Sequence, residues 1–181
     1  MSSELANSLL RARSIESFWR RHAGDSKLST FSALKTEIDR LIRVDLRVAG
    51  RLADRIEALA HLAGDPVSTA FAAASRARVL HFTGRYADAS AKYITAVKGL
   101  KAAKLKAEAA QVQRQHVGVL AELGRYKDAL SEARQVRRLL APGDSVQHAQ
   151  LEANIGTAYY RLDRYKEALD HYERARSLLP R

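Results

Sequence analysis

Apolar residues recur at steps of three and four along most of this chain. Between residues 149 and 162 they lie at positions that share one face of a helix, namely Leu151, Ile155, Ala158 and Leu162. After a short polar stretch the same spacing resumes, at Tyr165, Ala168, Leu169, Tyr172 and Ala175. The pattern predicts two amphipathic helices, which run antiparallel because the connection between them is short.

A phrase of similar wording occurs three times, as GRYADASAKYITA, GRYKDALSEARQV and DRYKEALDHYERA. The central alanine of each phrase is Ala89, Ala129 and Ala168, so the phrase recurs at a nearly constant period of about 40 residues. Internal repetition at such a period indicates stacked supersecondary units. Each unit is expected to be a helix, a turn and an antiparallel helix.

The turn of each phrase begins with a residue suited to a left-handed backbone. Gly84 and Gly124 follow an apolar helix end, where that backbone caps the last carbonyl groups without a Cβ clash. The third copy has Asp163, which tolerates the conformation better than most residues. The tyrosine two residues later is expected to fill the wedge between the two helices, and the repeated alanine to lie where their backbones approach most closely. These tyrosines are Tyr86, Tyr126 and Tyr165.

The last copy resembles a tetratricopeptide repeat. It has the family's residues in order and spacing, at Ile155, Gly156, Tyr159, Ala168, Tyr172, Ala175 and Pro180. It departs from the family at Glu152, where Trp is preferred, and at Asp163, where Gly is preferred. The middle copy keeps Gly124, Tyr126 and Ala129, and the first keeps Gly84, Tyr86, Ala89, Tyr93 and Ala96. The period is longer than the usual one of about 34 residues and is similar to extended repeats of bacterial regulators, peptide sensors and kinesin light chains.

The resemblance covers about residues 70–181 and implies an all-α fold, a right-handed superhelical solenoid of antiparallel helix pairs. Helical patterns at 30–43 and 46–62 extend it backwards as a degenerate pair, with Ser29 or Thr30 as the first cap. The expected segments are an N-terminal helical cap at 1–27, the degenerate pair at 28–66, and repeats at 67–108, 109–147 and 148–181.

Composition mainly excludes classes of protein. The chain has no Cys, no run of about 18 apolar residues and no signal-peptide pattern, so we expect a cytoplasmic protein that neither spans nor binds a membrane. No GxSxG, P-loop, GxGxxG or HExxH motif occurs, so we expect no enzyme, no cofactor and no metal. His148 and Glu152 lie four residues apart, a spacing that also arises by chance in helices.

Charge raises an alternative function. The net charge is +11, and residues 63–148 carry most of it. Arg43, Arg47, Arg51 and Arg55 follow at four-residue steps and are expected on one side of one helix. These arginines either bind phosphates or an acidic helix, or they form a solvent-exposed face with no binding role. A nucleic-acid or other polyanion binder that uses the basic central region is therefore the alternative to a protein-binding module.

In the tetratricopeptide family the first helix of each pair lines a groove for the partner. The resemblance implies a groove formed by Phe71, Arg78, His81, Gln111, Arg114, Asn154, Tyr160 and Arg161. Arginine donors beside amides and rings suit an acidic, extended peptide; the alternative is that these are ordinary exposed residues. Replacing Arg78, Arg114 and Arg161 together with Ala should then weaken the binding of an acidic partner with little change in the melting temperature of the chain. The Lys and Asn clamp of the chaperone-binding branch is absent.

The last predicted helix carries more apolar residues than one preceding helix should cover. They are Leu169, Tyr172, Leu178 and Leu179. We expect this face either to continue the array in a longer parent protein or to join two chains as a twofold homodimer. The sequence as a whole indicates a non-catalytic protein- or peptide-binding module, acting as a scaffold or a sensor.

Overall fold

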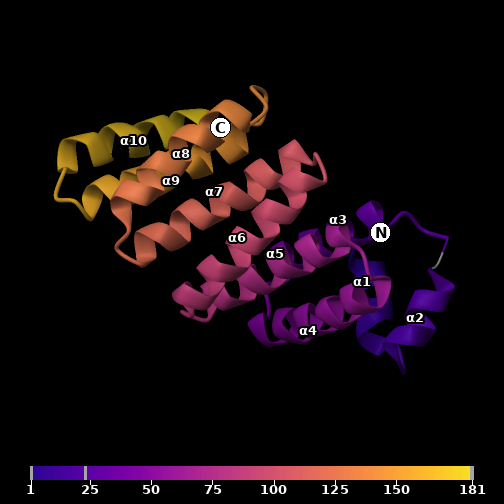
Figure 1. Cartoon of the computed structure of the whole chain (residues 1–181). Helices are drawn as coiled ribbons and strands as arrows, with labels where there is room; N and C mark the ends of the chain where they lie inside the picture. Colours follow the sequence, from indigo (N-terminus) through magenta and orange to yellow (C-terminus); the bar gives the residue numbers. More distant parts are fainter. Residues whose placement is uncertain (1, 23, 180–181) are drawn as a thin grey trace. The chain divides into compact units, whose positions relative to one another are not determined.

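The computed structural model describes residues 2–22 and 24–179, and Pro180 of the family pattern lies outside them. All regular structure in this part of the chain is α-helical, which confirms the predicted fold class (Figure 1). The right-handed superhelical course of the helix pairs stays a prediction. In chain order the helices are α1 Ser2–Arg11, α2 Ile15–Arg21, α3 Lys27–Leu41, α4 Leu46–Ala63, α5 Pro66–Phe82, α6 Tyr86–Ala102, α7 Lys106–Glu122, α8 Tyr126–Leu139, α9 Ser145–Tyr160 and α10 Tyr165–Leu178.

The helices belong to two compact units. Unit 1 comprises residues 1–104 with α1 to α6, and unit 2 comprises residues 105–181 with α7 to α10. The division between them falls inside the segment 67–108 that the sequence assigns to one repeat. The segment boundaries themselves stay a prediction.

In unit 1 the helices α3, α4 and α5 pack against one another, α6 packs on α5, and the short helices α1 and α2 cover α3 and α4. Aspartates start two of these helices, because Asp45 and Asp65 each accept hydrogen bonds from two backbone N–H groups of the first turn. The cap of α3 is Ser26, so the prediction of Ser29 or Thr30 was wrong. The interior is built mainly from large apolar side chains, among them Phe18, Phe31, Leu34, Ile38, Leu52, Ile56 and Tyr93.

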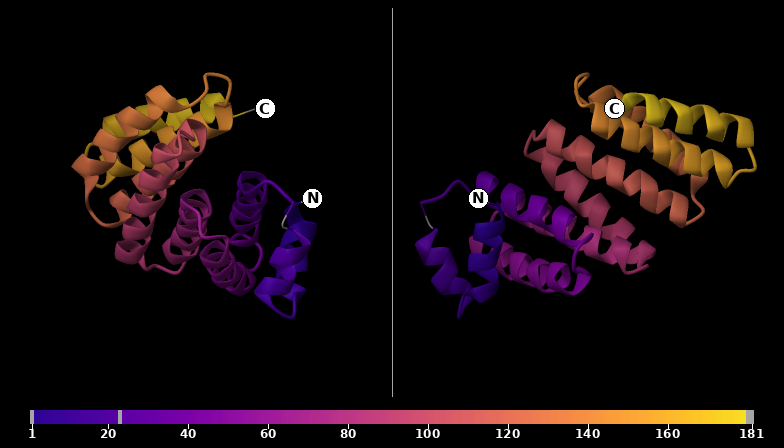
Figure 2. Two further views of the ribbon diagram at one scale, coloured as in Figure 1. Left: turned by 45° about the vertical axis from the view of Figure 1, so that its right-hand side comes forward. Right: turned by 180° about the vertical axis from the view of Figure 1, so that it is seen from behind.

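In unit 2 the helices form two antiparallel pairs, α7 with α8 and α9 with α10, which Figure 2 shows as neighbouring ribbons. One apolar cluster joins the pairs, because α9 inserts side chains against both α7 and α8. Its members include Val117, Leu120, Ala129, Ala133, Val136, Leu151, Ile155 and Ala158.

The three repeated turns have the backbone that their sequence predicts. The φ angles are 75° at Gly84, 72° at Gly124 and 58° at Asp163, all in the left-handed region. The next N–H group reaches back five residues to a carbonyl of the preceding helix and ends it. These bonds run from Arg85 to Leu80 at 2.9 Å, from Arg125 to Leu120 at 2.8 Å and from Arg164 to Tyr159 at 3.0 Å.

Arginine stands at the N-cap of the second helix in each of these three pairs, and its guanidinium holds the acid three residues later. The Nε atoms donate across 2.8 Å in each case, from Arg85 to Asp88, from Arg125 to Asp128 and from Arg164 to Glu167. These exposed ion pairs repeat with the turn and place negative charge in the first turn of the helix, where the helix dipole favours it.

Candidate protein-binding surfaces

Arg78 of the predicted groove is an interior tie between two helices. Its side chain, on α5, is buried, with 8% of the residue exposed. Its Nε donates to Oδ1 of Asp39 on α3 at 2.6 Å, and its guanidinium lies 4.9 Å from the ring centre of Phe82. Lys35 donates to the other oxygen of Asp39 at 2.6 Å. The prediction that Arg78 projects into an open groove was therefore wrong.

The charges in this network stabilise one another. Burial opposes ionisation of Asp39, but Lys35 and Arg78 outweigh it and hold the pKa of Asp39 below its ordinary value. Burial likewise disfavours the guanidinium of Arg78, but Tyr93 and Asp39 outweigh it and raise the pKa of Arg78. Asp39 and Arg78 are thus both charged at neutral pH, and their pairing holds α3 against α5.

The other two predicted groove residues of α5 also face inward. Phe71 is 2% exposed and belongs to the core, so its assignment to an open groove was wrong. His81 is half-buried, and its Nδ1 has no hydrogen-bond partner among the described residues. Burial first, and then the charge of Arg78, lower the pKa of His81 to about 4. The ring is therefore neutral at physiological pH.

In unit 2 the structure brings part of the predicted groove together. Asn154 on α9 donates from Nδ2 to the carbonyl of Arg114 on α7 at 3.2 Å, and Arg114 donates from Nε to Gln147 at 3.4 Å. Arg114 is itself largely buried, while Gln111 is half-buried on the same helix. The amide of Asn154 thus links α9 to α7, and the prediction that Arg114 projects into an open groove was wrong, as it was for Arg78.

Tyr160 and Arg161 lie at the C-terminal end of α9, and both are exposed. The ring of Tyr160 packs edge-on against Tyr165 with 5.6 Å between ring centres. Tyr165 is 59% exposed and donates its hydroxyl to Asp163 at 2.7 Å. Its ring therefore does not fill a wedge between helices, and that prediction was wrong for the third copy, although Tyr126 does pack against the core of unit 2.

The α9–α10 pair presents an apolar outer face. Leu169, Tyr172 and Leu179 of the predicted set are exposed, and Leu178 is half-buried. Tyr165 and Tyr160 extend this surface, which the sequence reasoning missed because it placed Tyr165 in the interior. We call Tyr160, Tyr165, Leu169, Tyr172 and Leu179 the terminal face.

In the preceding α7–α8 pair, the positions that correspond to the terminal face are covered by another helix. One period before Tyr165, Leu169 and Tyr172 stand Tyr126, Leu130 and Ala133. Ala133 is fully buried, and Tyr126 and Leu130 pack against the cluster that α9 completes with Leu151 and Ile155. The same positions are therefore covered by a helix in the α7–α8 pair and are exposed in the α9–α10 pair.

Glu152, which replaces the family's tryptophan, ties three helices of unit 2. It is 7% exposed and forms an ion pair with Arg137 of α8. On α10, His171 Nδ1 lies 2.7 Å from Glu152 and Arg174 Nε lies 3.4 Å from it. His148 instead contacts the carbonyl of Ala141 at 3.1 Å. No group of three or more metal-ligating side chains occurs among the residues described, and the His148–Glu152 pair that the sequence raised is divided between these other contacts.

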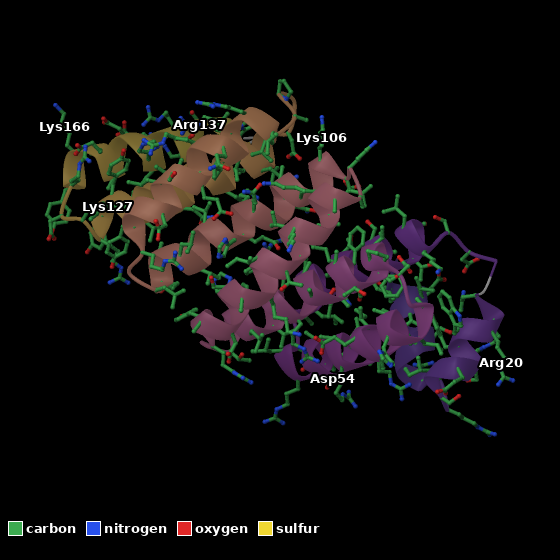
Figure 3. The ribbon with its side chains drawn as sticks, in the orientation of Figure 1. Arg20, Asp54, Lys106, Lys127, Arg137 and Lys166 are labelled. Carbon is green, nitrogen blue, oxygen red and sulfur yellow. The ribbon has the colours of Figure 1, made fainter. Side chains whose placement is uncertain are left out.

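The arginine stripe does not lie on one helix. Arg43 is in the turn before α4, so the prediction of a four-residue stripe on a single helix was wrong. Arg55 donates to the carbonyl of Ala12 at 3.0 Å and holds the end of α1. Arg47 and Arg51 are exposed on α4. Charged side chains project from unit 2 as well, and Figure 3 labels Lys127 and Lys166 there.

Alternating helices, a repeated left-handed turn and a core shared between neighbouring pairs define unit 2 as an α-helical repeat. Residues 108–181 match the model of a family described as Tetratricopeptide repeat, a range that contains α8, α9, α10 and nearly all of α7. This C-terminal part of the chain is therefore similar to tetratricopeptide repeats. No curated protein matches the sequence. None of the described helices is long and apolar enough to cross a membrane.

Proposed function

We propose that the chain is a non-catalytic protein-binding module that pairs with a second copy of itself through the terminal face. Tetratricopeptide repeats generally mediate protein–protein interaction or scaffolding and are typically non-catalytic. The observation that carries the proposal is the exposure of Tyr165, Leu169 and Tyr172 at positions that α9 covers in the preceding pair. Fully burying an exposed side chain of this kind contributes roughly 1.5–3 kcal/mol, and these three, which are 39–59% exposed, would gain the corresponding part of it.

The charges of α10 favour a second copy as the occupant. Residues seven apart share a helix face, and Lys166 and Glu173 are both exposed on the solvent side of α10. When two α10 helices cross antiparallel about a twofold axis near position 170, Lys166 faces Glu173 of the second copy. The same arrangement sets Leu169 against Tyr172 and Tyr165 against Arg176. The face is thus self-complementary in charge and in apolar character, as a closed twofold contact requires.

Light scattering coupled to size exclusion, across a concentration series, tests this proposal. We expect a monomer–dimer equilibrium that Leu169→Glu shifts to monomer. Val146→Glu is the matched control, because Val146 is an exposed apolar residue of α9 outside the terminal face. Lys166→Glu and Glu173→Lys should each weaken the dimer, and the double exchange should restore it. A wild-type chain that stays monomeric at the highest concentration would refute the proposal.

An acidic peptide on the α7–α9 surface is the second candidate function. The amides of Gln111, Gln147 and Asn154 lie on α7 and α9, and Arg161 adds an exposed charge at the end of α9. Arginine and amide donors recognise carboxylates of an extended chain. A glutamate-rich peptide should bind less tightly to Arg161→Ala, with Arg138→Ala on α8 as the control. Equal affinity for both variants would remove Arg161 from the site.

A further inference from the structure

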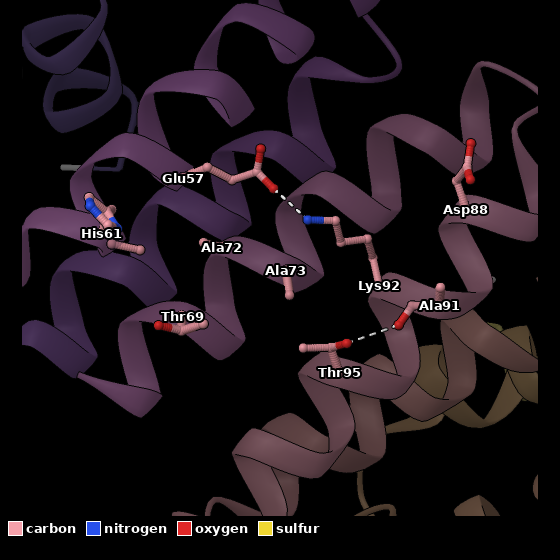
Figure 4. A pocket seen from close by; sticks show the side chains of 10 residues that line it. Glu57, His61, Thr69, Ala72, Ala73, Asp88, Ala91, Lys92 and Thr95 are labelled. Carbon is pink, nitrogen blue, oxygen red and sulfur yellow. Dashed lines mark hydrogen bonds and ion pairs between the residues drawn. The ribbon is translucent and has the colours of Figure 1, made fainter. Parts of the chain in front are cut away.

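Unit 1 contains a trough that neither the proposed dimer nor the α7–α9 surface uses. Helix α5 packs between α4 and α6, and the space above its first half forms two adjoining cavities of about 490 and 840 Å³. Both cavities are lined by Ala60 and His61 of α4, Thr69 of α5 and Thr95 of α6, so they form one continuous hollow. Figure 4 shows the side chains that line the smaller cavity. We call it the α4–α6 trough.

The floor of the trough is formed largely by small side chains. Besides Thr69 and Thr95, the lining includes alanines, among them Ala72 and Ala73 on α5 and Ala91 on α6. Both threonine hydroxyls already donate within their own helices, to the carbonyls of Asp65 at 3.0 Å and Ala91 at 3.1 Å. The floor therefore offers methyl groups and room for the larger side chains of a partner.

The carboxylates that line the trough are already neutralised by the chain itself. Glu57 pairs with Lys92 at 3.0 Å and with Arg76 at 2.8 Å. Burial opposes ionisation of Glu57, but Arg76 and Lys92 outweigh it and lower its pKa. The two other lining carboxylates, Asp88 and Asp65, are paired with Arg85 at 2.6 Å and Lys27 at 3.4 Å.

Two cationic or protonatable lining residues, by contrast, have no ion-pair partner among the described residues. Lys98 is exposed on α6, and His61 is exposed on α4 across the trough from it. The charge left uncompensated at the trough is therefore positive, and it complements an acidic partner. The exposed side chain of Ile94 adds an apolar contact on the same rim.

The length of the trough and the hydrogen bonding of its walls indicate which conformation a partner would have. The lining positions on α6 run from Asp88 to Ala102, about 21 Å at the rise of an α-helix. The walls are helices whose backbone groups bond internally, and the threonine hydroxyls are engaged, so the trough offers few partners to an extended peptide backbone. A helix satisfies its own backbone groups and needs none from the trough.

We propose that the α4–α6 trough binds an acidic amphipathic helix of a partner protein. Large apolar side chains at helical spacing of three and four residues would fill the alanine floor, and a carboxylate at the rim would pair with Lys98. The site is in unit 1 and is independent of the terminal face of unit 2.

The probe is a fluorescent synthetic peptide with Leu on one helical face and Glu on the other. A length of about 16 residues suffices, because a helix of that length spans about 24 Å and covers the trough. We expect saturable binding by fluorescence anisotropy, a gain of peptide helix in circular dichroism, and at least tenfold weaker binding when Lys replaces Glu. Thr95→Trp, which fills the trough from an exposed position, should weaken binding at least tenfold. Ala58→Trp, at an exposed position of α4 outside the lining, should leave it unchanged.

Three results would overturn the proposal. The first is equal peptide affinity in Thr95→Trp and wild type, and the second is binding without gain of helix. The third is loss of peptide binding in Leu169→Glu, which would place the peptide on the terminal face instead. Light scattering of Thr95→Trp separates the two proposals, because the dimer should form in this variant whether or not the peptide binds.

Discussion

Replacing Arg78 should destabilise unit 1 strongly, although a charged side chain on a repeat helix would ordinarily be expected to tolerate substitution. In Arg78→Ala, the carboxylate of Asp39 loses the donor that approaches it to 2.6 Å and keeps Lys35. Removing one member of a buried ion pair costs about 3–5 kcal/mol. Because the side chain of Asp39 is 24% exposed, water recovers part of this cost, and we expect a loss of about 2–3 kcal/mol.

A change of this size is readily measured. At about 4 °C per kcal/mol for a unit of some hundred residues, the unfolding midpoint of unit 1 should fall by about 8–12 °C. Thermal and urea unfolding followed by far-UV circular dichroism provide the assay. Arg161→Ala is the control, because that side chain is exposed and such changes usually stay within about 0.5 kcal/mol.

The pair itself is isolated by a double-mutant cycle of Arg78→Gln with Asp39→Asn, for which we expect a coupling energy above about 1 kcal/mol. The lowered pKa of Asp39 adds a pH signature. Its stabilising contribution is complete above the ordinary aspartate pKa of about 4 and is lost as the pH falls below it. If Arg78→Ala costs no more than an ordinary surface substitution, about 0.5 kcal/mol, or if the coupling energy is near zero, the reasoning is refuted.

Three further substitutions test other contacts. Burial lowers the pKa of His81 to about 4, so the stability that its neutral ring contributes is present above about pH 6.5 and is lost as the pH falls towards 4. His81→Leu should remove this pH dependence, which amounts to at most about 3 kcal/mol and is smaller for the part of the ring that water reaches. Urea unfolding midpoints of both proteins at pH 6.5 and pH 4 would measure it. Gly99→Ala should cost about 1–3 kcal/mol, because the new Cβ would lie 2.7 Å from Cβ of Ala70, and an unchanged melting temperature would contradict this close approach. Asp163→Gly should stabilise the protein by up to about 1 kcal/mol and so raise its melting temperature, because a left-handed φ of 58° strains an L-residue. A lower melting temperature would mean that the hydrogen bond between Asp163 and Tyr165 contributes more than the strain costs.

The repeat and its turns are local properties, and the sequence was sufficient to predict them. A helical period needs only the spacing of apolar residues, and a left-handed turn needs only a residue that tolerates positive φ. Gly84, Gly124 and Asp163 therefore have the predicted backbone, and the all-α class follows from the same signals.

Whether a polar side chain is buried or exposed, and which group it pairs with, was decided by the tertiary structure. Arg78 and Arg161 look equivalent along the chain, yet one is buried on Asp39 of a different helix and the other is exposed. Glu152 could be seen as a departure from the family, but its partners on α8 and α10 depend on how three helices meet. Helical periodicity indicates which face of a helix is apolar, but not which charges lie opposite it.

The two proposed binding surfaces show the same limit. Tyr126 and Tyr165 occupy the same place in the repeated phrase, but Tyr126 packs against a core that a helix of the next pair completes, whereas Tyr165 is exposed. The α4–α6 trough exists because alanines on α5 leave space between two helices that the sequence separates by about one repeat. Local pattern thus determined the helices and their turns, whereas burial, ion pairing and the binding surfaces were decided by which helices lie side by side, because each depends on groups far apart in the chain.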